Sequence, residues 1–288
     1  MSMPMEMITE IAELERAGFY WRDVDGIRAL ICKPLELDGF TNGFSTRMGG
    51  VSPMPHDALN LAGFNEDSAD NILENRRRFL KLFPGEWSLA GCWQIHSAEL
   101  RVVKDAAQAQ SQPYATGDED RCDALVSDRN GILLGVKTAD CVPVLMGDAR
   151  TGAFAAVHAG WRGTVASICI KAVSQLMREY DTKPGDLRVA IGPAAGVCCY
   201  EIGQEVIDRF KTNFADSDDL FTATREGHAR IDLFEANRRQ LISTGVDPER
   251  IHISSLCTMC RTDVFFSYRQ EKAVQGKVGR LMAVVGKR

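Results

Sequence analysis

The sequence is poor in histidine: five histidines are spread over 288 residues, and no two of them form a His-x-His pair. A centre of several copper ions needs many imidazole ligands, so this small supply argues against one. The chain also lacks the H-x-E and P-C-x-x-C motifs of the zinc enzymes that act on flipped nucleobases. That absence excludes the fold that carries those motifs.

Charge of one sign is not concentrated anywhere in the chain. Lys and Arg total 34, Asp and Glu total 39, and the net charge at pH 7 is −5. A surface that binds nucleic acid or a membrane needs a grouped set of basic residues. We therefore expect neither kind of partner.

The first twenty residues lack an uninterrupted apolar stretch. Pro4 and four glutamates break them, so they form neither the apolar core of a signal peptide nor a spanning helix. The nine cysteines are an odd number, whereas the disulfide framework of a secreted domain uses pairs. We expect a cytoplasmic protein with free thiols, and a chain of this length can bury a core without disulfides.

Short apolar runs bounded by Gly, Asp or Pro alternate with helical patterns. The runs predict strands at residues 27–32, 40–46, 100–104, 132–138, 141–147, 153–159, 187–193, 250–255 and 280–286. The patterns predict helices at 68–83, with Ser68 as the N-cap, and at 164–180, 203–214 and 232–244. We expect a mixed α/β (α+β) fold with layered mixed sheets flanked by helices. The only loop-like stretch, 105–120, is expected to be a surface excursion near a site, so residues 1–288 are expected to form a single domain.

The segment GDARTG, Gly147 to Gly152, separates two of these apolar runs. Strands joined by so short a turn pair antiparallel. Cys141 opens the first strand and His158 closes the second, so both lie at the end of the pair away from the turn. The sequence therefore predicts that Cys141 and His158 are close together.

His96, Cys141 and His158 are candidate metal ligands, because each lies beside a strand end or a glycine turn where a side chain can face a cleft. Two imidazoles and one thiolate suit Zn²⁺, and three protein ligands leave a fourth position open, as in catalytic sites. The separations of 45 and 17 residues match no short metal motif. From the residues alone, an ordinary buried histidine at position 158 remains the alternative.

Seven motifs follow one another in an order known from one family: NGFSTRMGGVS, QIHSAEL, DALVSD, GVKTADCVPVL, AVHAGWRGT, AIGPAAGVCCYEIG and CTMCRTDVFFSYRQ. From about Phe40 to its C-terminus the chain resembles the YfiH-like proteins. These are also called laccase-domain or multicopper polyphenol oxidoreductase proteins and were later described as purine nucleoside phosphorylases.

The resemblance implies one catalytic domain with Zn²⁺ bound by His96, Cys141 and His158. It also implies zinc-dependent phosphorolysis of purine nucleosides, with adenosine deaminase and methylthioadenosine phosphorylase activities. The expected small-molecule partners are a purine nucleoside and phosphate. An open zinc position can activate the water that deamination needs, whereas phosphorolysis needs a bound phosphate.

The motif STRMGG joins Arg47 to Gly49 and Gly50. A guanidinium and exposed glycine N–H groups can together bind phosphate, although a plain turn is the alternative. Arg162 precedes an expected helix start at Thr164, a second place where backbone donors and a guanidinium meet. We expect these two arginines and two glycines to bind substrate.

Two aspartates accompany the candidate ligands. Asp140 precedes Cys141, and in an extended strand its side chain points to the opposite face, so we expect a catalytic role behind the ligands or at the substrate rather than metal ligation. Asp123, in CDALV, is expected to bind substrate, with a turn cap as the alternative.

Cys257 and Cys260 have C-x-x-C spacing, but the sequence offers no second such pair to complete four ligands. The adjacent Cys198 and Cys199 cannot easily share an ion, and the residues after them fit the wall of a cleft. We therefore expect packing thiols here rather than a redox or zinc site.

Two other functions stay open. A copper-dependent polyphenol oxidase would hold Cu²⁺ at His96, Cys141 and His158, because copper competes well for such ligands. A single copper position is too few for electron transfer to O₂, which needs several redox sites. A metal-free hydrolase would use Cys141 as nucleophile and a histidine as base. Metal content separates the three functions.

Overall fold

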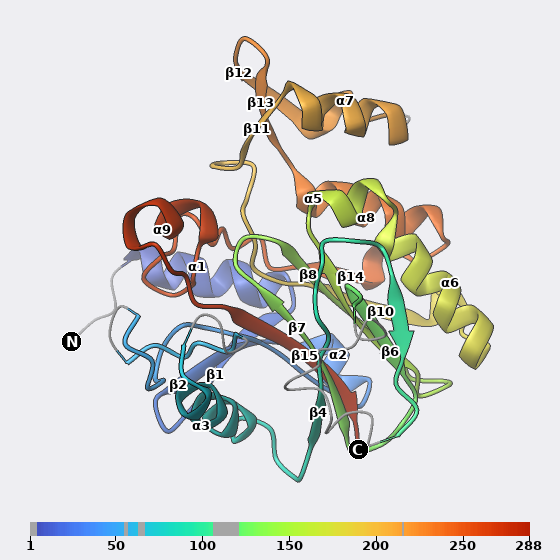
Figure 1. The fold of residues 1–288 in the computed structure, drawn as a ribbon. Coiled ribbons are helices and arrows are strands. Elements are labelled where there is room, and N and C mark those ends of the chain that lie inside the picture. Colours follow the sequence, from blue (N-terminus) through green and yellow to red (C-terminus); the bar gives the residue numbers. More distant parts are fainter. Residues whose placement is uncertain (1–4, 55–56, 63–66, 106–120, 215) are drawn as a thin grey trace.

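Two large sheets pack against each other, and helices cover their outer sides (Figure 1). The computed structural model describes residues 5–54, 57–62, 67–105, 121–214 and 216–288. The expected surface loop at 105–120 lies, apart from its first residue, outside the described residues.

The first sheet has the strand order β1-β2-β3-β15-β7-β4. Its strands are β1 (Phe19–Val24), β2 (Ile27–Cys32), β3 (Phe40–Ser45), β15 (Leu281–Lys287), β7 (Ile132–Thr138) and β4 (Ser88–Ala90). The last strand of the chain, β15, lies between β3 and β7 and is antiparallel to both, whereas β4 runs parallel to β7. The sheet is therefore mixed.

The second sheet has the order β14-β10-β8-β9-β6-β5. Its strands are β14 (Ile251–Ile253), β10 (Leu187–Ile191), β8 (Val142–Asp148), β9 (Phe154–Ala159), β6 (Ala124–Ser127) and β5 (Leu100–Val102). The predicted antiparallel pairing of β8 with β9 is confirmed, with Pro143 opposite His158. Strands β10 and β14 run parallel, so the chain leaves both at the same edge of the sheet.

The core lies between the sheets and on their outer faces. Phe40 of the first sheet meets Phe154 of the second, with ring centroids 6.2 Å apart. Helices α5 (Trp161–Val165), α6 (Ile168–Tyr180) and α8 (Leu233–Ser243) pack on the outer face of the second sheet. Helix α3 (Ala69–Leu80) packs on the first. Because apolar side chains cover both faces, β8 and β9 read as nearly continuous apolar runs.

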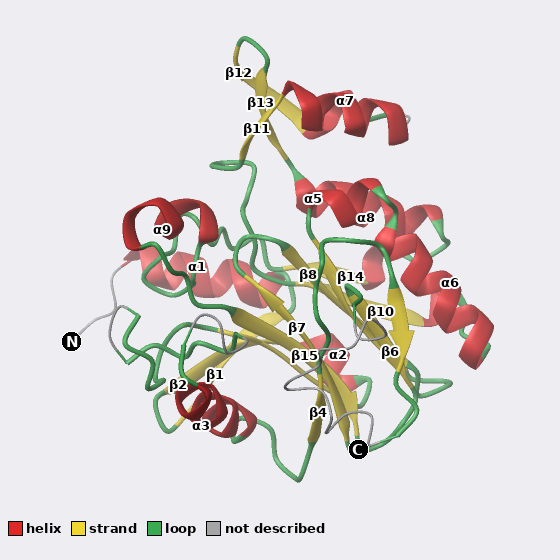
Figure 2. Cartoon of the chain, in the orientation of Figure 1, coloured by secondary structure: helices red, strands yellow, loops and turns green. Residues whose placement is uncertain are grey.

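A small third sheet projects from this body together with α7 (Figure 2). Its strands, in the order β11-β13-β12, are β11 (Glu201–Gly203), β13 (His228–Ile231) and β12 (Phe221–Arg225). The remaining helices are α1 (Met5–Arg16), α2 (Lys33–Leu37), α7 (Gln204–Asn213) and α9 (Tyr268–Gln275), with 3₁₀ turns at Pro184–Asp186, Asp218–Leu220 and Pro248–Arg250.

The mixed α/β class is confirmed, and most predicted elements are present. Ser68 caps α3 as predicted, since its hydroxyl accepts a hydrogen bond from the Asn71 N–H at 3.3 Å. The single helix predicted at 164–180 is wrong: the helix begins at Trp161 and is interrupted at Ser167, whose φ of +62° is left-handed. Within the described ranges, every helix is too short or too polar to span a bilayer.

Candidate metal centre and active site

The structure brings His96, Cys141 and His158 together. One ligand atom from each lies within 4.8 Å of the other two, and the imidazole rings meet edge to face with centroids 5.0 Å apart. His158 lies near the end of β9, Cys141 directly precedes β8, and His96 lies on the connection from β4 to β5. We refer to these three residues as the mixed cluster.

Gly160 makes room for the mixed cluster. In the β8–β9 register, Val142 faces Ala159, which places Gly160 beside Cys141. A Cβ at Gly160 would come within 2.9 Å of the Cys141 Sγ and 3.3 Å of the His96 Cδ2. Both distances are shorter than ordinary contacts, so the sequence needs glycine at this position, a requirement that sequence reasoning missed.

Asp123 holds both histidines from behind. Its Oδ1 lies 2.8 Å from the Nδ1 of His158 and accepts the backbone N–H of His96 at 3.0 Å. Its Oδ2 accepts the backbone N–H of Ser97 at 2.7 Å and the Ser97 hydroxyl at 2.8 Å. This use of Nδ1 leaves the Nε2 of His158 for a metal ion.

These contacts place Asp123 behind the two histidines, and the residue is 0% exposed. Its expected role in binding substrate stays a prediction. Burial alone would raise the pKa of this carboxyl group, but the hydrogen bond and charge of His158 and the bonds from Ser97 hold that pKa below its usual range.

Cys141 favours the thiolate form that a metal ion requires. Burial raises the pKa of a thiol, yet the charge and hydrogen bonds of His158, together with those of His96, lower the pKa of Cys141 to about 6. Burial likewise lowers the pKa of His158, but the Cys141 thiolate and Asp123 raise it to about 9. Each partner therefore favours the charged form of the other, the Cys141 thiolate and the His158 imidazolium, when no metal ion is bound.

Asp140 joins the mixed cluster to two loops. Its Oδ1 accepts the Thr258 hydroxyl at 2.7 Å, and its Oδ2 accepts the Ser267 hydroxyl at 3.1 Å and the Arg269 N–H at 2.7 Å. Its backbone is left-handed, with a φ of +86°. Burial raises the pKa of this carboxyl group. Asp140 therefore fixes the chain just before Cys141.

Arg47, Gly49 and Gly50, the expected phosphate cradle, make several contacts within the chain. The Nη1 of Arg47 donates to Thr262 O at 2.6 Å and to the buried Glu271 carboxylate at 2.9 Å. The Gly50 N–H donates to the Asp57 carbonyl at 2.8 Å. These donors are thus engaged within the chain.

Close backbone packing explains both glycines. A Cβ at Gly49 would lie 2.4 Å from the Gly26 carbonyl oxygen, and one at Gly50 would lie 2.0 Å from that of Ala58. Arg47 and Gly49 line a cavity of about 780 Å³, whose lining includes three carboxylates that repel phosphate and none of the three mixed-cluster residues.

Arg162 is exposed and lies over the Trp161 ring, 4.3 Å from its centroid. The helix starts earlier than predicted, so Arg162 stands in its first turn, two residues after Gly160. Tyr200 forms part of the neighbouring wall: burial, followed by the negative charge of Cys141, raises the pKa of its hydroxyl to about 12.

Lys137 is a candidate that sequence reasoning missed. Its backbone N–H donates to the Gln94 amide oxygen at 2.8 Å, and its carbonyl accepts from the Gln94 amide nitrogen at 2.6 Å. Gln94 lies two residues before His96. Burial and the positive charges of Arg76 and Arg280 lower the pKa of the Lys137 ammonium. The Lys137 ammonium donates to the Cys92 carbonyl at 3.0 Å, so one cationic side chain lies against the segment that carries His96.

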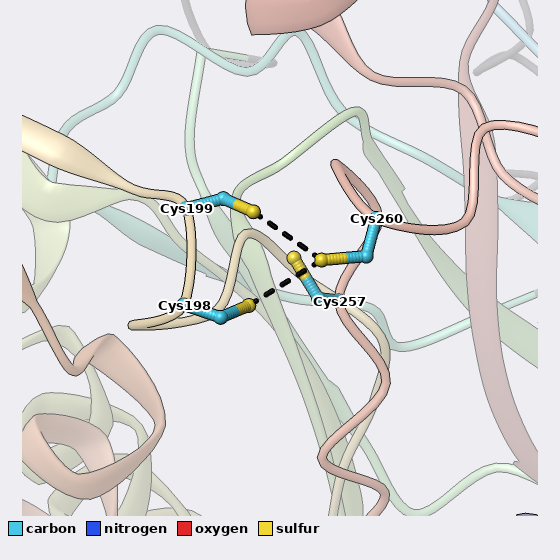
Figure 3. Close-up of side chains that lie close together, drawn as sticks. All are labelled: Cys198, Cys199, Cys257 and Cys260. Atoms are coloured by element: carbon cyan, nitrogen blue, oxygen red, sulfur yellow. Dashed lines mark hydrogen bonds between the residues drawn. The ribbon is translucent and has the colours of Figure 1, made fainter.

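Cys257 and Cys260 do not stand alone, contrary to expectation. Cys198 and Cys199 join them, and all four sulfur atoms lie within 4.8 Å of one another (Figure 3). We refer to these residues as the cysteine cluster.

Known proteins resemble this chain over most of its length. Residues 41–288 match the family described as multi-copper polyphenol oxidoreductase laccase. The purine nucleoside phosphorylase YlmD of Geobacillus stearothermophilus is 35% identical over 263 residues, which cover 90% of this chain and 94% of the relative. Adenosine deaminase RL5, from an unknown prokaryotic organism, is 32% identical over 90% of this chain and 94% of its own. The crystal structure of the Bacillus licheniformis hypothetical protein YfiH matches with a TM-score of 0.85 and 31% identity, over 94% of this chain and 99% of that one.

Proposed function

We propose that this chain, which belongs to the multi-copper polyphenol oxidoreductase laccase family, is a zinc-dependent purine nucleoside phosphorylase that also deaminates adenosine and phosphorolyses methylthioadenosine. Its relatives named purine nucleoside phosphorylase YlmD and adenosine deaminase RL5 support these activities. The observation that carries the proposal is the mixed cluster, which gathers three metal ligands and leaves one position for substrate chemistry.

The donor set of the mixed cluster fits zinc. Two imidazoles and one thiolate are borderline-soft ligands, and three of them make an open rather than a closed site. Bound there, Zn²⁺ supplies Lewis acidity at its open position. The chain keeps Cys141 as a thiolate and fixes the ring of His158 through Asp123. Asp140 holds the Cys141 segment, so both aspartates act as positioning residues.

Phosphate binding in this proposal rests on the cation beside the segment that carries His96. The Lys137 ammonium lies against this segment and donates to the Cys92 carbonyl at 3.0 Å, so it offers a positive charge to an anion near His96. Arg162, exposed after Gly160, is a further residue that can meet substrate. Arg47 has less support, because Thr262 and Glu271 occupy its Nη1.

A paired measurement tests the phosphate site. We expect Lys137→Gln to raise the KM for phosphate in inosine phosphorolysis while leaving phosphate-independent deamination of adenosine much less affected. We expect Arg47→Ala to lower the melting temperature, because it leaves Glu271 buried without its partner, and to slow both reactions alike. A selective loss of phosphorolysis in Arg47→Ala would instead support Arg47 as the phosphate-binding residue.

A copper-dependent polyphenol oxidase is the second candidate, favoured by the family's description. The low pKa of Cys141 beside His158 favours a third, a metal-free cysteine hydrolase. Protein purified without added metal distinguishes them: we expect zinc in the mixed cluster, conversion of inosine and adenosine, and no oxidation of phenols. Phenol turnover by copper-loaded protein that far exceeds nucleoside turnover by zinc protein would establish the oxidase instead. Full activity after metal removal would favour the hydrolase.

The proposal also covers the location of the protein, its domain organisation and its partners. The nine free cysteines support a cytoplasmic location. The family match over residues 41–288 supports one catalytic domain. The partners are small molecules, a purine nucleoside and phosphate, with no nucleic acid or membrane.

A further inference from the structure

The cysteine cluster is compact enough to surround one metal ion. The sulfur of Cys260 lies 3.5 Å from that of Cys198 and 3.2 Å from that of Cys199, and no pair of the four exceeds 4.8 Å (Figure 3). Four sulfurs at about 2.3 Å from Zn²⁺ in a tetrahedron are about 3.8 Å apart. The two Cys260 separations are slightly shorter than that value and the 4.8 Å limit lies above it, and the four thiols are free rather than joined by the S–S bond of about 2.05 Å in a disulfide.

The backbone holds the two halves of the cysteine cluster in register. Strands β10 and β14 run parallel, so the segments that follow them leave the same edge of the sheet. Beyond the strands, Ala194 forms a parallel bridge with Cys257, and the Thr258 N–H donates to Ala194 O at 2.9 Å. The cysteines therefore meet because of the sheet, although 62 residues separate Cys198 from Cys260.

Gly196 shapes a turn that wraps around the sulfur atoms. Its N–H donates to the Cys257 Sγ at 3.3 Å, a bond that favours a thiolate, and its carbonyl accepts from Cys199 and Tyr200 at 3.0 and 2.9 Å. A Cβ at Gly196 would crowd the Cys198 sulfur and the Cys257 Cβ, each at 3.3 Å. The turn thus presents one backbone donor and two neighbouring thiols to the same point.

We propose that Cys198, Cys199, Cys257 and Cys260 bind one Zn²⁺ ion as a structural site, separate from the mixed cluster. Four thiolates close the tetrahedron and leave no position for substrate, so the ion fastens two loops instead of reacting. Each thiol gives up its proton to the solvent on binding, and no cysteine is oxidised. Exposure of Cys198 and Cys260 gives the ion a path from solvent.

A zinc ion here would stabilise the wall of the active site. One loop contains Tyr200, and the other contains Thr258, whose hydroxyl donates to Asp140 beside Cys141. The Ala195 N–H also donates to the Asp140 carbonyl at 2.9 Å. The cysteine cluster therefore fixes the loops from which Asp140 receives two of its contacts.

Elemental analysis of protein purified under reducing conditions without added metal tests the site. We expect two zinc ions per chain in the wild type and one fewer in Cys260→Ser than in the wild type. Cys141→Ala should also lose one ion, and the double variant should lose both. Met259→Leu, in the same loop but without a lost thiol, should keep the wild-type content. Circular dichroism establishes that each variant is folded.

Equal zinc contents in wild type and Cys260→Ser would overturn the proposal, whatever the mixed cluster binds. Peptide mapping of the native protein gives a second measurement. We expect the four thiols to resist alkylation until a chelator and mild denaturant remove the metal. A disulfide between the two loops, or copper in place of zinc, would also overturn the assignment.

Discussion

The mixed cluster and the cysteine cluster lie at the same edge of the second sheet but differ in their donors. The mixed cluster offers two nitrogens and one sulfur, and a buried carboxylate, Asp123, orients its histidines. The cysteine cluster offers four sulfurs, and a backbone N–H, that of Gly196, supports one of them. Three donors leave a metal ion open to substrate, whereas four enclose it, so we propose catalysis at the mixed cluster and a stabilising role for the cysteine cluster.

The same comparison explains where each cluster is rigid. In the mixed cluster, side-chain contacts fix a loop residue, His96, whose φ of +58° is left-handed. In the cysteine cluster, backbone bonds that extend the pairing of β10 with β14 fix both loops. The mixed cluster therefore depends on positioning side chains as well as on its ligands, whereas the cysteine cluster depends on its ligands and on the backbone bonds between its loops.

The largest expected effect separates the clusters by activity. Cys141→Ala should reduce nucleoside phosphorolysis and deamination by at least about 1000-fold, because a Lewis acid contributes several kcal/mol to the transition state. Cys260→Ser should instead lower the melting temperature and keep most of the activity below it. Steady-state kinetics and thermal melts of both variants provide the measurements. Equal activity losses would show that the clusters are one functional unit.

Replacing the carboxylate behind the mixed cluster should have the next largest effect. Asp123→Asn retains the shape of the side chain but has one oxygen acceptor in place of two, so metal affinity or activity should fall by about 10-fold to 100-fold. Asp128→Asn is the matched control, since Asp123 directly precedes β6 and Asp128 directly follows it. Zinc titration and kcat/KM should leave the control unchanged. A normal Asp123→Asn enzyme would refute the positioning role.

The part of the mixed cluster that follows from local sequence is the pair Cys141 and His158. The short turn between two apolar runs places them on neighbouring strands, and the structure has that hairpin. His96 has no such local link: its position beside a predicted strand made it a candidate, and the family resemblance assigned it to the same site as the pair. Its position depends on contacts with Asp123, 27 residues away in the chain.

The contacts that sequence reasoning missed join residues far apart in the chain. Cys198 meets Cys260 only because β10 and β14 are neighbours, a pairing that no motif spacing reveals. Arg47 looked available for phosphate, yet its partner Glu271 is 224 residues away. Ser167 interrupts a helical pattern in a left-handed conformation for which serine gives no signal. Individual elements were predictable where their residues were adjacent, and the polar contacts between elements were not.

Gly160→Ala tests how tightly the mixed cluster is packed. The φ of Gly160 is −67°, which alanine adopts readily, so the cost comes from the new Cβ against the Cys141 sulfur and the His96 ring. Overpacking of about 1–3 kcal/mol predicts a loss of about 5-fold to 150-fold in metal affinity. At Gly185 a Cβ would find its nearest neighbour 4.0 Å away, so Gly185→Ala is the control. Unchanged zinc affinity in Gly160→Ala would mean that the ligands can move aside.

The smallest expected effect concerns how the stability of the protein changes with pH through His252, which lies in the strand before Cys257. Burial and the positive charge of Arg188 lower the pKa of His252 in β14, and its Nε2 has no hydrogen-bond partner among the described residues. The pKa of His252 in the unfolded chain is about 6.5. Above that pH the imidazole is neutral in both the folded and the unfolded state, so it does not lower the free energy of unfolding. As the pH falls, the unfolded chain binds the proton first. Stability is then lost until the lower pKa of the folded state is reached.

His252→Gln removes this titration and should therefore flatten the dependence of melting temperature on pH. The variant should lose about 2 °C less than the wild type between about pH 8 and pH 5. Protonation of the cysteine thiolates also destabilises the protein in acid, but it acts equally on both chains and cancels in the difference. Parallel slopes for the two proteins would show that His252 takes up its proton in the folded state as readily as in the unfolded one. Acid sensitivity would then come from the metal clusters and the buried carboxylates.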